Sequence, residues 1–199
     1  SYVAFLKRDP SAIKRNPATI DRLAGNLYEM GIDKIIEKST EPKETNRQIG
    51  PLFKRWIDNG TLGAKVFKDS SEFLNYDGNS ILNTSDHSMA EFCNQYLGYK
   101  HDKGIDFLAK FNGTYVIGEA KFLTDFGGHQ NGQFNDAIST IKSSFDSSKL
   151  GAKIIKIAIL DGVLYIKSGN KMYRFLQNNP DLIIISSLLL REFLYSIWG

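Results

Sequence analysis

The sequence predicts an α/β protein in which helices flank a mixed β-sheet. From residue 86 onward, apolar patterns with helical and strand periodicity follow in the order helix, strand, strand, helix, strand, strand. Strand pairs joined by tight turns and separated by helices are typical of a mixed sheet with helices packed on it. We therefore expect a mainly helical N-terminal region over 1–84 and a core with a C-terminal helix over 85–199, both within one compact unit.

The composition is that of an ordinary globular domain. The chain has 199 residues, of which 42% are hydrophobic and 24% charged, and this length can bury a sizeable core. No apolar run reaches the roughly 18 residues of a membrane span, and no basic and apolar leader is found, so we expect no membrane association. The single cysteine, Cys93, excludes an internal disulfide and suits a reducing cytoplasm.

Two amphipathic helices are expected in the N-terminal region. Asn16 and Pro17 provide a cap and a first-turn proline for a helix that ends at Gly31. A polar connection over 39–46 leads to a second helix over 46–58, whose polar face carries three cations. These cations are Arg47, Lys54 and Arg55. They suit either a solvated helix face or a surface that contacts phosphates.

Residues 61–85 are turn-rich and predict no regular element, but a helix begins directly after them. Ser85 or Asp86 is a favourable N-cap, and the helix continues to Leu97. One face of this helix is apolar, which places it against the expected sheet.

A β-hairpin is the strongest local prediction in the chain. Apolar runs at 105–111 and 115–122 suit buried strands, and Asn112-Gly113 lies between them. An Asn-Gly pair favours a type I′ turn, because both central residues of that turn need positive φ. A glycine-rich polar loop is expected over 123–132 and a helix over 133–147.

The last part of the chain is expected to complete the sheet and to end in a helix. A strand over 153–160, a tight turn at Asp161-Gly162 and an antiparallel partner over 163–167 would form a second hairpin. The remaining elements are two short apolar runs and a final helix, at 172–176, at 182–185 and from Ser186 or Ser187 to Trp198.

The first hairpin brings two acids and a lysine together. A turn at 112–113 sets Asp106 opposite Glu119, and facing residues of an antiparallel pair point to the same side, with Cβ atoms about 4.5–5.5 Å apart. Lys121 lies two positions beyond Glu119 and therefore shares that side. A surface ion pair on a plain sheet is the alternative interpretation of these three residues.

Two carboxylates this close favour a cation between them, because each would otherwise resist ionisation. Oxygen ligands with room for water favour Mg²⁺, for which Mn²⁺ can substitute, and the Ala120 carbonyl can add a backbone ligand. Such a metal would acidify a bound water and stabilise the charge that develops on a phosphate. Lys121 would hold this water or help to deprotonate it.

The distribution of charge agrees with a cation site that acts on a polyanion. Residues 1–60 and 131–199 each carry a net charge of +3, whereas residues 61–130 carry −3. An acidic centre between basic arms would suit a metal together with nucleic acid. Charge fluctuations of this size also arise by chance on a solvated surface.

The succession of Asp106, a hairpin turn and Glu119-Ala120-Lys121, with a helix on either side, resembles the PD-(D/E)xK nucleases, most closely the type II restriction endonucleases. The resemblance covers roughly residues 86–160. It implies a restriction-endonuclease-like core, with Asp106 and Glu119 as metal ligands and Lys121 as the catalytic lysine. Members often add an acid from the preceding helix, and Glu91 matches it by position. Ile105 stands where the motif has proline.

Two segments are the expected contacts for DNA. Side chains that can read base edges or clamp phosphates gather in the loop over 125–135. They are His129, Gln130, Asn131, Gln133 and Asn135, and the helix over 46–58 adds Arg47, Lys54 and Arg55. A flexible polar loop that caps the following helix explains 125–135 equally well.

The expected function is that of a Mg²⁺-dependent, sequence-specific endodeoxyribonuclease of the type II restriction class in a prokaryotic-type cytoplasm. It would hydrolyse phosphodiesters of double-stranded DNA to 5′-phosphate and 3′-hydroxyl ends. A homodimer, held by the N-terminal region or the C-terminal helix, would most simply cut both strands of a two-fold symmetric site. The alternatives are a repair or junction-resolving nuclease on the same core and a non-catalytic DNA-binding module.

Overall fold

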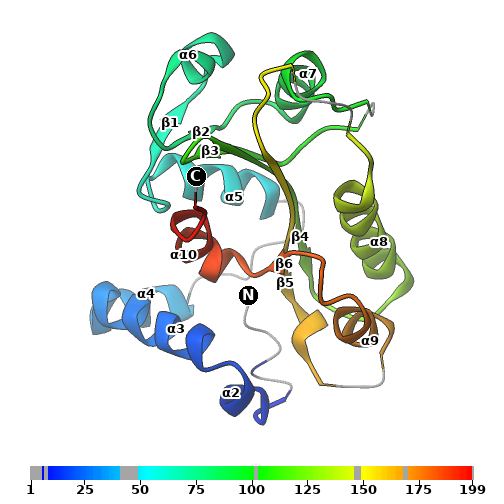
Figure 1. Cartoon of the computed structure of the whole chain (residues 1–199). Helices are drawn as coiled ribbons and strands as arrows, with labels where there is room; N and C mark the ends of the chain where they lie inside the picture. The colour runs from blue at the N-terminus through cyan, green and yellow to red at the C-terminus, as the bar shows by residue number, and fades with distance from the viewer. Residues whose placement is uncertain are drawn as a thin grey trace.

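A six-stranded sheet forms the centre of the computed structural model, which describes residues 6, 9–40, 49–100, 103–145, 149–167 and 170–198 (Figure 1). Neighbouring strands follow the chain order from β1 to β6. β2, β3 and β4 pair antiparallel, whereas β1 is parallel to β2, and β4, β5 and β6 are parallel to one another. The predicted mixed sheet is confirmed. Its strands are β1 (Lys65–Phe67), β2 (Ser80–Leu82), β3 (Phe107–Phe111), β4 (Thr114–Leu123), β5 (Ile154–Gly162) and β6 (Ile184–Ile185).

Helices cover both faces of this sheet, as predicted (Figure 1). α7 and α8 pack on one face, α5 and α10 pack on the other, and α3 with α4 forms a helical pair in the N-terminal region. Among the described residues, no helix combines the length and apolar character that a membrane crossing requires. The helices are α2 (Ala12–Arg15), α3 (Pro17–Met30), α4 (Ile32–Thr40), α5 (Ile49–Asp58), α6 (Ser70–Asn75), α7 (Asp86–Tyr96), α8 (Gly128–Lys142), α9 (Lys171–Asn178) and α10 (Leu190–Tyr195), with 3₁₀ helices η2 (Val163–Tyr165) and η3 (Ser187–Leu189).

The β3–β4 hairpin has the predicted turn and the predicted register. Asn112 and Gly113 have φ values of 48° and 74°, the signs that a type I′ turn requires. The paired residues run from Phe111 opposite Thr114 to Phe107 opposite Gly118. One further step along the same register sets Asp106 opposite Glu119.

Side chains alternate between the two faces along β4. Ile117 belongs to the apolar cluster under α7, whereas Val116 packs with Ile57 of α5 and Leu190 of α10. Because side chains of a strand alternate with a period of two, Glu119 shares the α7 side of the sheet. The polar site is thus built on the same face as the aromatic part of the core.

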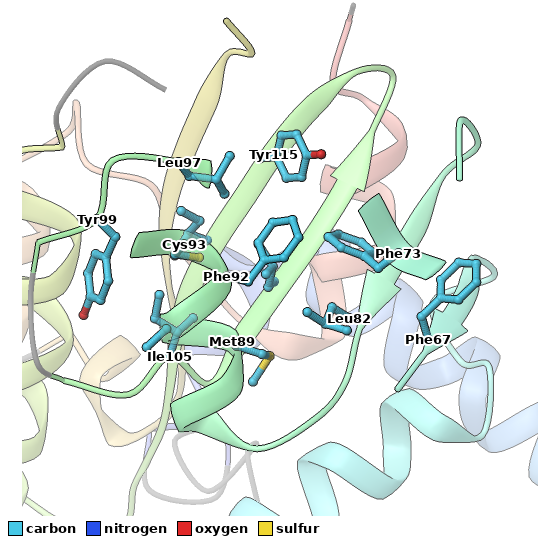
Figure 2. Packing of buried hydrophobic residues seen from close by; sticks show 13 residues of the cluster. Phe67, Phe73, Leu82, Met89, Phe92, Cys93, Leu97, Tyr99, Ile105 and Tyr115 are labelled. Atoms are coloured by element: carbon cyan, nitrogen blue, oxygen red, sulfur yellow. The ribbon is translucent and has the colours of Figure 1, made fainter. Parts of the chain in front are cut away.

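That aromatic part lies beneath α6 and α7 (Figure 2). The Phe73 ring is 5.4 Å from that of Phe92 and 6.1 Å from that of Tyr115, measured between centroids. Ser85 is the N-cap of α7, as predicted, and its hydroxyl accepts a hydrogen bond from the Ser88 amide. Cys93 is buried in the same cluster, and burial raises the pKa of its thiol, so it packs as an apolar residue.

Four elements lie where the sequence predicted none. The segment over 61–85 contains β1, α6 and β2, so the sheet begins before residue 85. Both strands have only three residues, too few for an alternating pattern to be recognised. α6 is short as well, and its cap is Asp69, whose carboxylate accepts hydrogen bonds from the amides of Ser71 and Glu72. α4 also occupies a segment to which no element was assigned.

The prediction for residues 123–147 was wrong at both ends of the helix. α8 begins at Gly128 and ends at Lys142, so half of the expected polar loop is helical. Gly128 and Gly132 are poor helix formers, which is why the pattern favoured a loop. A tertiary contact outweighs this propensity, because the buried Gln130 side chain accepts a hydrogen bond from the Thr124 amide at 3.2 Å.

The second predicted hairpin does not form. β5 pairs with β4 on one side and β6 on the other, so no edge is left for a strand over 163–167. That segment begins with η2, and the short apolar run over 172–176 lies in α9. Gly162 redirects the chain at this point with a φ of 108°. A Cβ atom there would lie 1.9 Å from the Leu123 carbonyl oxygen, so only glycine fits.

Substitution of Gly162 should therefore destabilise the protein through both backbone strain and a steric clash. We expect Gly162→Ala to lower the free energy of unfolding by about 3 kcal/mol or more. Gly113→Ala is the matched control, because Gly113 also has positive φ but a Cβ atom added to it would meet no described atom within 4 Å. It should cost only the backbone contribution of about 1–2 kcal/mol. Urea titrations measure both values, and equal losses would contradict the steric argument.

Candidate active site

The sequence-predicted acids meet at the start of β3. Asp106 precedes the first residue of β3, and its Oδ2 atom accepts a hydrogen bond from the Ala120 amide at 2.9 Å. The carboxylate thus takes the place of the next rung of the β3–β4 ladder, just before β3 begins. This contact and the register of the hairpin place Asp106 beside Glu119, as the sequence predicted.

Lys121 lies between the two carboxylates. Its Nζ atom is 3.0 Å from Asp106 Oδ2 and 2.6 Å from Glu119 Oε1. The structure therefore brings Asp106, Glu119 and Lys121 together on one side of the sheet. The Lys121 ammonium offsets the repulsion between the two carboxylates.

Glu119 is the most buried ionisable group of this cluster, with 2% of the residue exposed. Burial raises the pKa of Glu119, and the nearby Asp106 raises it further, against the opposing effect of Lys121 and Lys103. For Lys121, burial alone would lower the pKa, but Asp106 and Glu119 together hold it above its ordinary value. Within the described part of the chain, Glu119 Oε2 is a buried acceptor without a hydrogen-bond partner.

Lys103 is a fourth member of the cluster, which the sequence analysis missed. Its Nζ atom is 3.1 Å from Glu119 Oε1. Lys103 precedes the strand, where no periodicity indicates the direction of a side chain. Its backbone carbonyl accepts a hydrogen bond at 2.8 Å from the hydroxyl of Tyr99, whose pKa is raised to about 12 by burial and by Glu119.

The donor atoms fit a hard divalent cation. Two carboxylates face each other, and the unpaired Glu119 Oε2 is an oxygen that a cation would satisfy. Since the N–H and C=O of a strand residue point to the same side, the Ala120 carbonyl is directed towards the Asp106 side of β4. No group of three or more His, Cys, Asp or Glu residues suited to a metal occurs among the described residues. The candidate ligand set is therefore two carboxylates and one carbonyl.

Glu91 lies on the exposed side of α7. Its side chain is 64% exposed, and its Oε1 atom is 3.3 Å from His87 Nε2, one helical turn away. The described contacts do not join Glu91 to the cluster of Asp106, Glu119 and Lys121.

The predicted DNA-contacting residues of 125–135 differ widely in exposure. Gln130 is 4% exposed, and its side chain holds the Thr124 backbone, a placement that does not favour contact with bases. Asn131 is half-buried and donates to the carbonyls of Phe126 and Gly127. His129 is exposed and Gln133 is half-buried, with 3.2 Å between their side-chain Nε2 atoms, and Asn135 is exposed.

His129 and Gln133 share a helical stripe with Asp136 and Thr140, because residues three and four apart lie on one face of a helix. Lys103 Nζ is 3.2 Å from the Asp136 carbonyl oxygen and 3.4 Å from Thr140 Oγ1. This stripe of α8 therefore leads to the lysine that contacts Glu119.

Lys54 and Arg55 line a hollow of about 690 Å³ between α5 and the start of α7. Lys54 Nζ is 2.7 Å from Asp86 Oδ1 and also donates to the Thr84 carbonyl. The Asp86 carbonyl in turn accepts a hydrogen bond from the Ile105 amide at 3.2 Å. The hollow thus borders the segment that carries Asp106. Arg47, predicted to share this face, lies outside the described residues.

A mixed sheet whose central hairpin places an Asp opposite a Glu-x-Lys, with helices on that face, defines the PD-(D/E)xK class of nucleases. Comparison with protein families gives the particular group: the chain belongs to the Tsp45I type II restriction enzyme family, whose model matches residues 1–197. The protein is therefore a site-specific deoxyribonuclease of a restriction system, and enzymes of this type generally use divalent metal ions. Comparisons with curated proteins and with solved structures gave no match.

The ion pairs of Lys121 should be measurable as a coupling energy in metal-free protein. Lys121→Met leaves the buried Glu119 carboxylate with less compensation and should lower the free energy of unfolding by about 3 kcal/mol. In the double variant Lys121→Met/Glu119→Gln, part of that loss should be recovered, because the buried charge is then removed as well.

Urea denaturation in the presence of EDTA provides these free energies. Glu91→Gln, on the exposed side of α7, is the control and should change stability by less than about 0.5 kcal/mol. Strictly additive effects of the two substitutions would show that Lys121 and Glu119 are not coupled.

Proposed function

We propose that this restriction enzyme cuts double-stranded DNA in a Mg²⁺-dependent reaction that leaves 5′-phosphate and 3′-hydroxyl ends. The observation that carries the proposal is the cluster of Asp106, Glu119 and Lys121 at the start of β3, with a buried carboxylate oxygen that lacks a partner among the described residues. Mn²⁺ should substitute for Mg²⁺, because both ions prefer oxygen ligands. The alternatives of a repair nuclease and a non-catalytic module lose their support, because the chain belongs to a restriction enzyme family.

Each residue of the cluster has a proposed role that follows from its surroundings. Asp106, Glu119 and the Ala120 carbonyl would hold the divalent cation. When bound, the cation would acidify a water and offset negative charge on the scissile phosphate. In the metal-free site, Asp106 and Glu119 raise the pKa of Lys121 against the effect of its burial. Beside a bound cation, Lys121 would donate hydrogen bonds to the water or the phosphate, or help to deprotonate the water.

The DNA would lie across the end of the sheet that carries this cluster, between α5 and α8. The hollow lined by Lys54 and Arg55 borders the Asp106 segment, which supports phosphate contacts by these two cations. On the other side of the cluster, the same stripe of α8 offers the exposed His129 and the half-buried Gln133 for base contacts. Asn135 and Asn131 lie on a neighbouring stripe of α8, and Asn131 is the less available because it already donates to two carbonyls.

A homodimer would place two such sites on the two strands of a symmetric DNA sequence. Of the two regions that the sequence left open, α3 and α4 are the better supported as the interface. Large apolar side chains on this helical pair are exposed, and a helix without buried apolar contacts is only marginally stable. The exposed residues are Leu27, Tyr28, Met30, Ile32 and Ile36, compared with Tyr195 and Trp198 near the C-terminus.

Digestion of a long plasmid in Mg²⁺ tests the activity, and we expect discrete bands. Asp106→Ala, Glu119→Ala and Lys121→Ala should each slow cutting by about 10²–10³-fold or more, since each removes charge stabilisation at the phosphate. Glu72→Ala, an exposed acid of α6, is the control and should cut like wild type. Glu91→Ala, measured alongside, would show whether this acid belongs to the site.

The products of the same digestion distinguish the alternatives. Linear DNA that forms without an accumulated nicked circle would support the homodimer. A smear, or cutting at branches alone, would instead indicate a nuclease without sequence preference. Wild-type rates in any of the three alanine variants would remove that residue from the proposed site.

The α8 stripe yields a separate prediction about sequence discrimination. His129→Ala and Gln133→Ala should each reduce the preference for the cognate site over a one-mismatch site by about tenfold, because a good base contact contributes about 1–3 kcal/mol. Gln130→Ala should lower stability and leave discrimination unchanged, since this side chain is buried against Thr124. Cleavage rates on both DNA sites and a thermal melt provide the comparison. Unaltered discrimination in both stripe variants would exclude base contacts by this part of α8.

A further inference from the structure

Glu119 Oε1 is shared by two lysines from different segments of the chain. Lys121 follows Glu119 on β4, whereas Lys103 comes from the segment before β3. We infer that Lys103 is a counter-ion that occupies Glu119 in the metal-free enzyme and competes with the divalent cation for it. This inference rests on the proposed function, because it assumes that Glu119 is a metal ligand.

The two lysines are not equivalent, and Lys103 is the one that is free to leave. Lys121 is 23% exposed and is also bound to Asp106, whereas the Lys103 side chain is 40% exposed. The Asp136 carbonyl and Thr140 Oγ1 lie within 3.4 Å of Lys103 Nζ. These two acceptors on α8 can retain the ammonium group when it releases Glu119.

Two hydrogen bonds hold the backbone at Lys103 and directly after it, which keeps the Lys103 side chain near Glu119. The Tyr99 hydroxyl donates to the Lys103 carbonyl, and the Ile105 amide donates to the Asp86 carbonyl. A Cβ atom on Gly104 would lie 2.8 Å from Asp86 Cβ, so the segment passes close against the start of α7. Only the flexible stem of Lys103 needs to move for Glu119 to be released.

The balance of charge around Glu119 explains why Lys103 would compete with a divalent cation. Without a metal, Asp106 and Glu119 are compensated by two ammonium groups, which allows the site to form before a cation arrives. A divalent cation at Glu119 would be repelled by an ammonium group that remains on Oε1. A cation bound through the open Glu119 Oε2 would therefore be weakened by Lys103 on Oε1, and its binding would favour the withdrawal of Lys103. A DNA phosphate nearby would offer the displaced lysine a new anionic partner, so DNA should favour metal binding.

Mn²⁺ binding in the absence of DNA, followed by electron paramagnetic resonance of the free ion at pH 8, tests the inference. Lys103→Met should bind Mn²⁺ about three- to tenfold more tightly than wild type, the effect expected of one partly exposed charge. Lys103→Arg keeps the charge and should resemble wild type. Lys153→Met, at an exposed position before β5, alters the net charge equally and should leave Mn²⁺ affinity unchanged. The Mn²⁺ binding that is lost in Glu119→Ala is the binding that belongs to this site.

A thermal melt of the same proteins separates competition from a merely structural role. Competition predicts that Lys103→Met melts below wild type in EDTA and regains most of the difference in saturating Mn²⁺. A loss of melting temperature that is equal with and without Mn²⁺ would overturn the inference. The inference would also be overturned if Glu119→Ala abolishes Mn²⁺ binding but Lys103→Met leaves that binding unchanged or weakens it. The proposed metal site would then stand, but without competition from Lys103. If Glu119→Ala has no effect on Mn²⁺ binding, the metal site itself fails and the inference fails with it.

Discussion

Two facing carboxylates, one of them almost fully buried, require compensating positive charge, and the surrounding structure has to supply it. Glu119 beside Asp106 is unfavourable unless positive charge lies close by. Lys121 bridges the pair, and Lys103 reaches it from another segment. α7 and α8 bury the apolar side chains of the same face, which keeps water away from Glu119 and strengthens every charge interaction there. The same fold therefore determines both the charge balance around Glu119 and its burial.

The parts of this site that sequence could predict are those governed by short-range rules. The Asn112-Gly113 turn determines the register of the hairpin, and the register with the alternation of strand side chains places Asp106, Glu119 and Lys121 on one side. The start of α7 was predictable for a similar reason, since the Ser85 cap acts on an amide three residues away. Such features need no knowledge of the remaining fold.

What the sequence did not predict depends on single side-chain contacts and on strand pairing, which residue patterns do not encode. The first turn of α8 contains poor helix formers and is held through the side chain of Gln130. The chain after Gly162 bends away because β4 and β6 already occupy both edges of β5. Lys103 belongs to the site through the direction of one flexible side chain in a segment without periodicity. Burial under α7 and α8 is likewise a property that no local pattern of residues encodes.

The order of the strands has a consequence for the entropy of assembling the site. Each strand lies beside its predecessor in the chain, and Asp106 meets Ala120 and Lys121 across only 14 and 15 positions. A short loop loses little conformational freedom when its ends are joined. The geometry of the acids and their lysine is thus a local property that one hairpin determines, whereas the reactivity of these groups is a property of the entire fold that buries them.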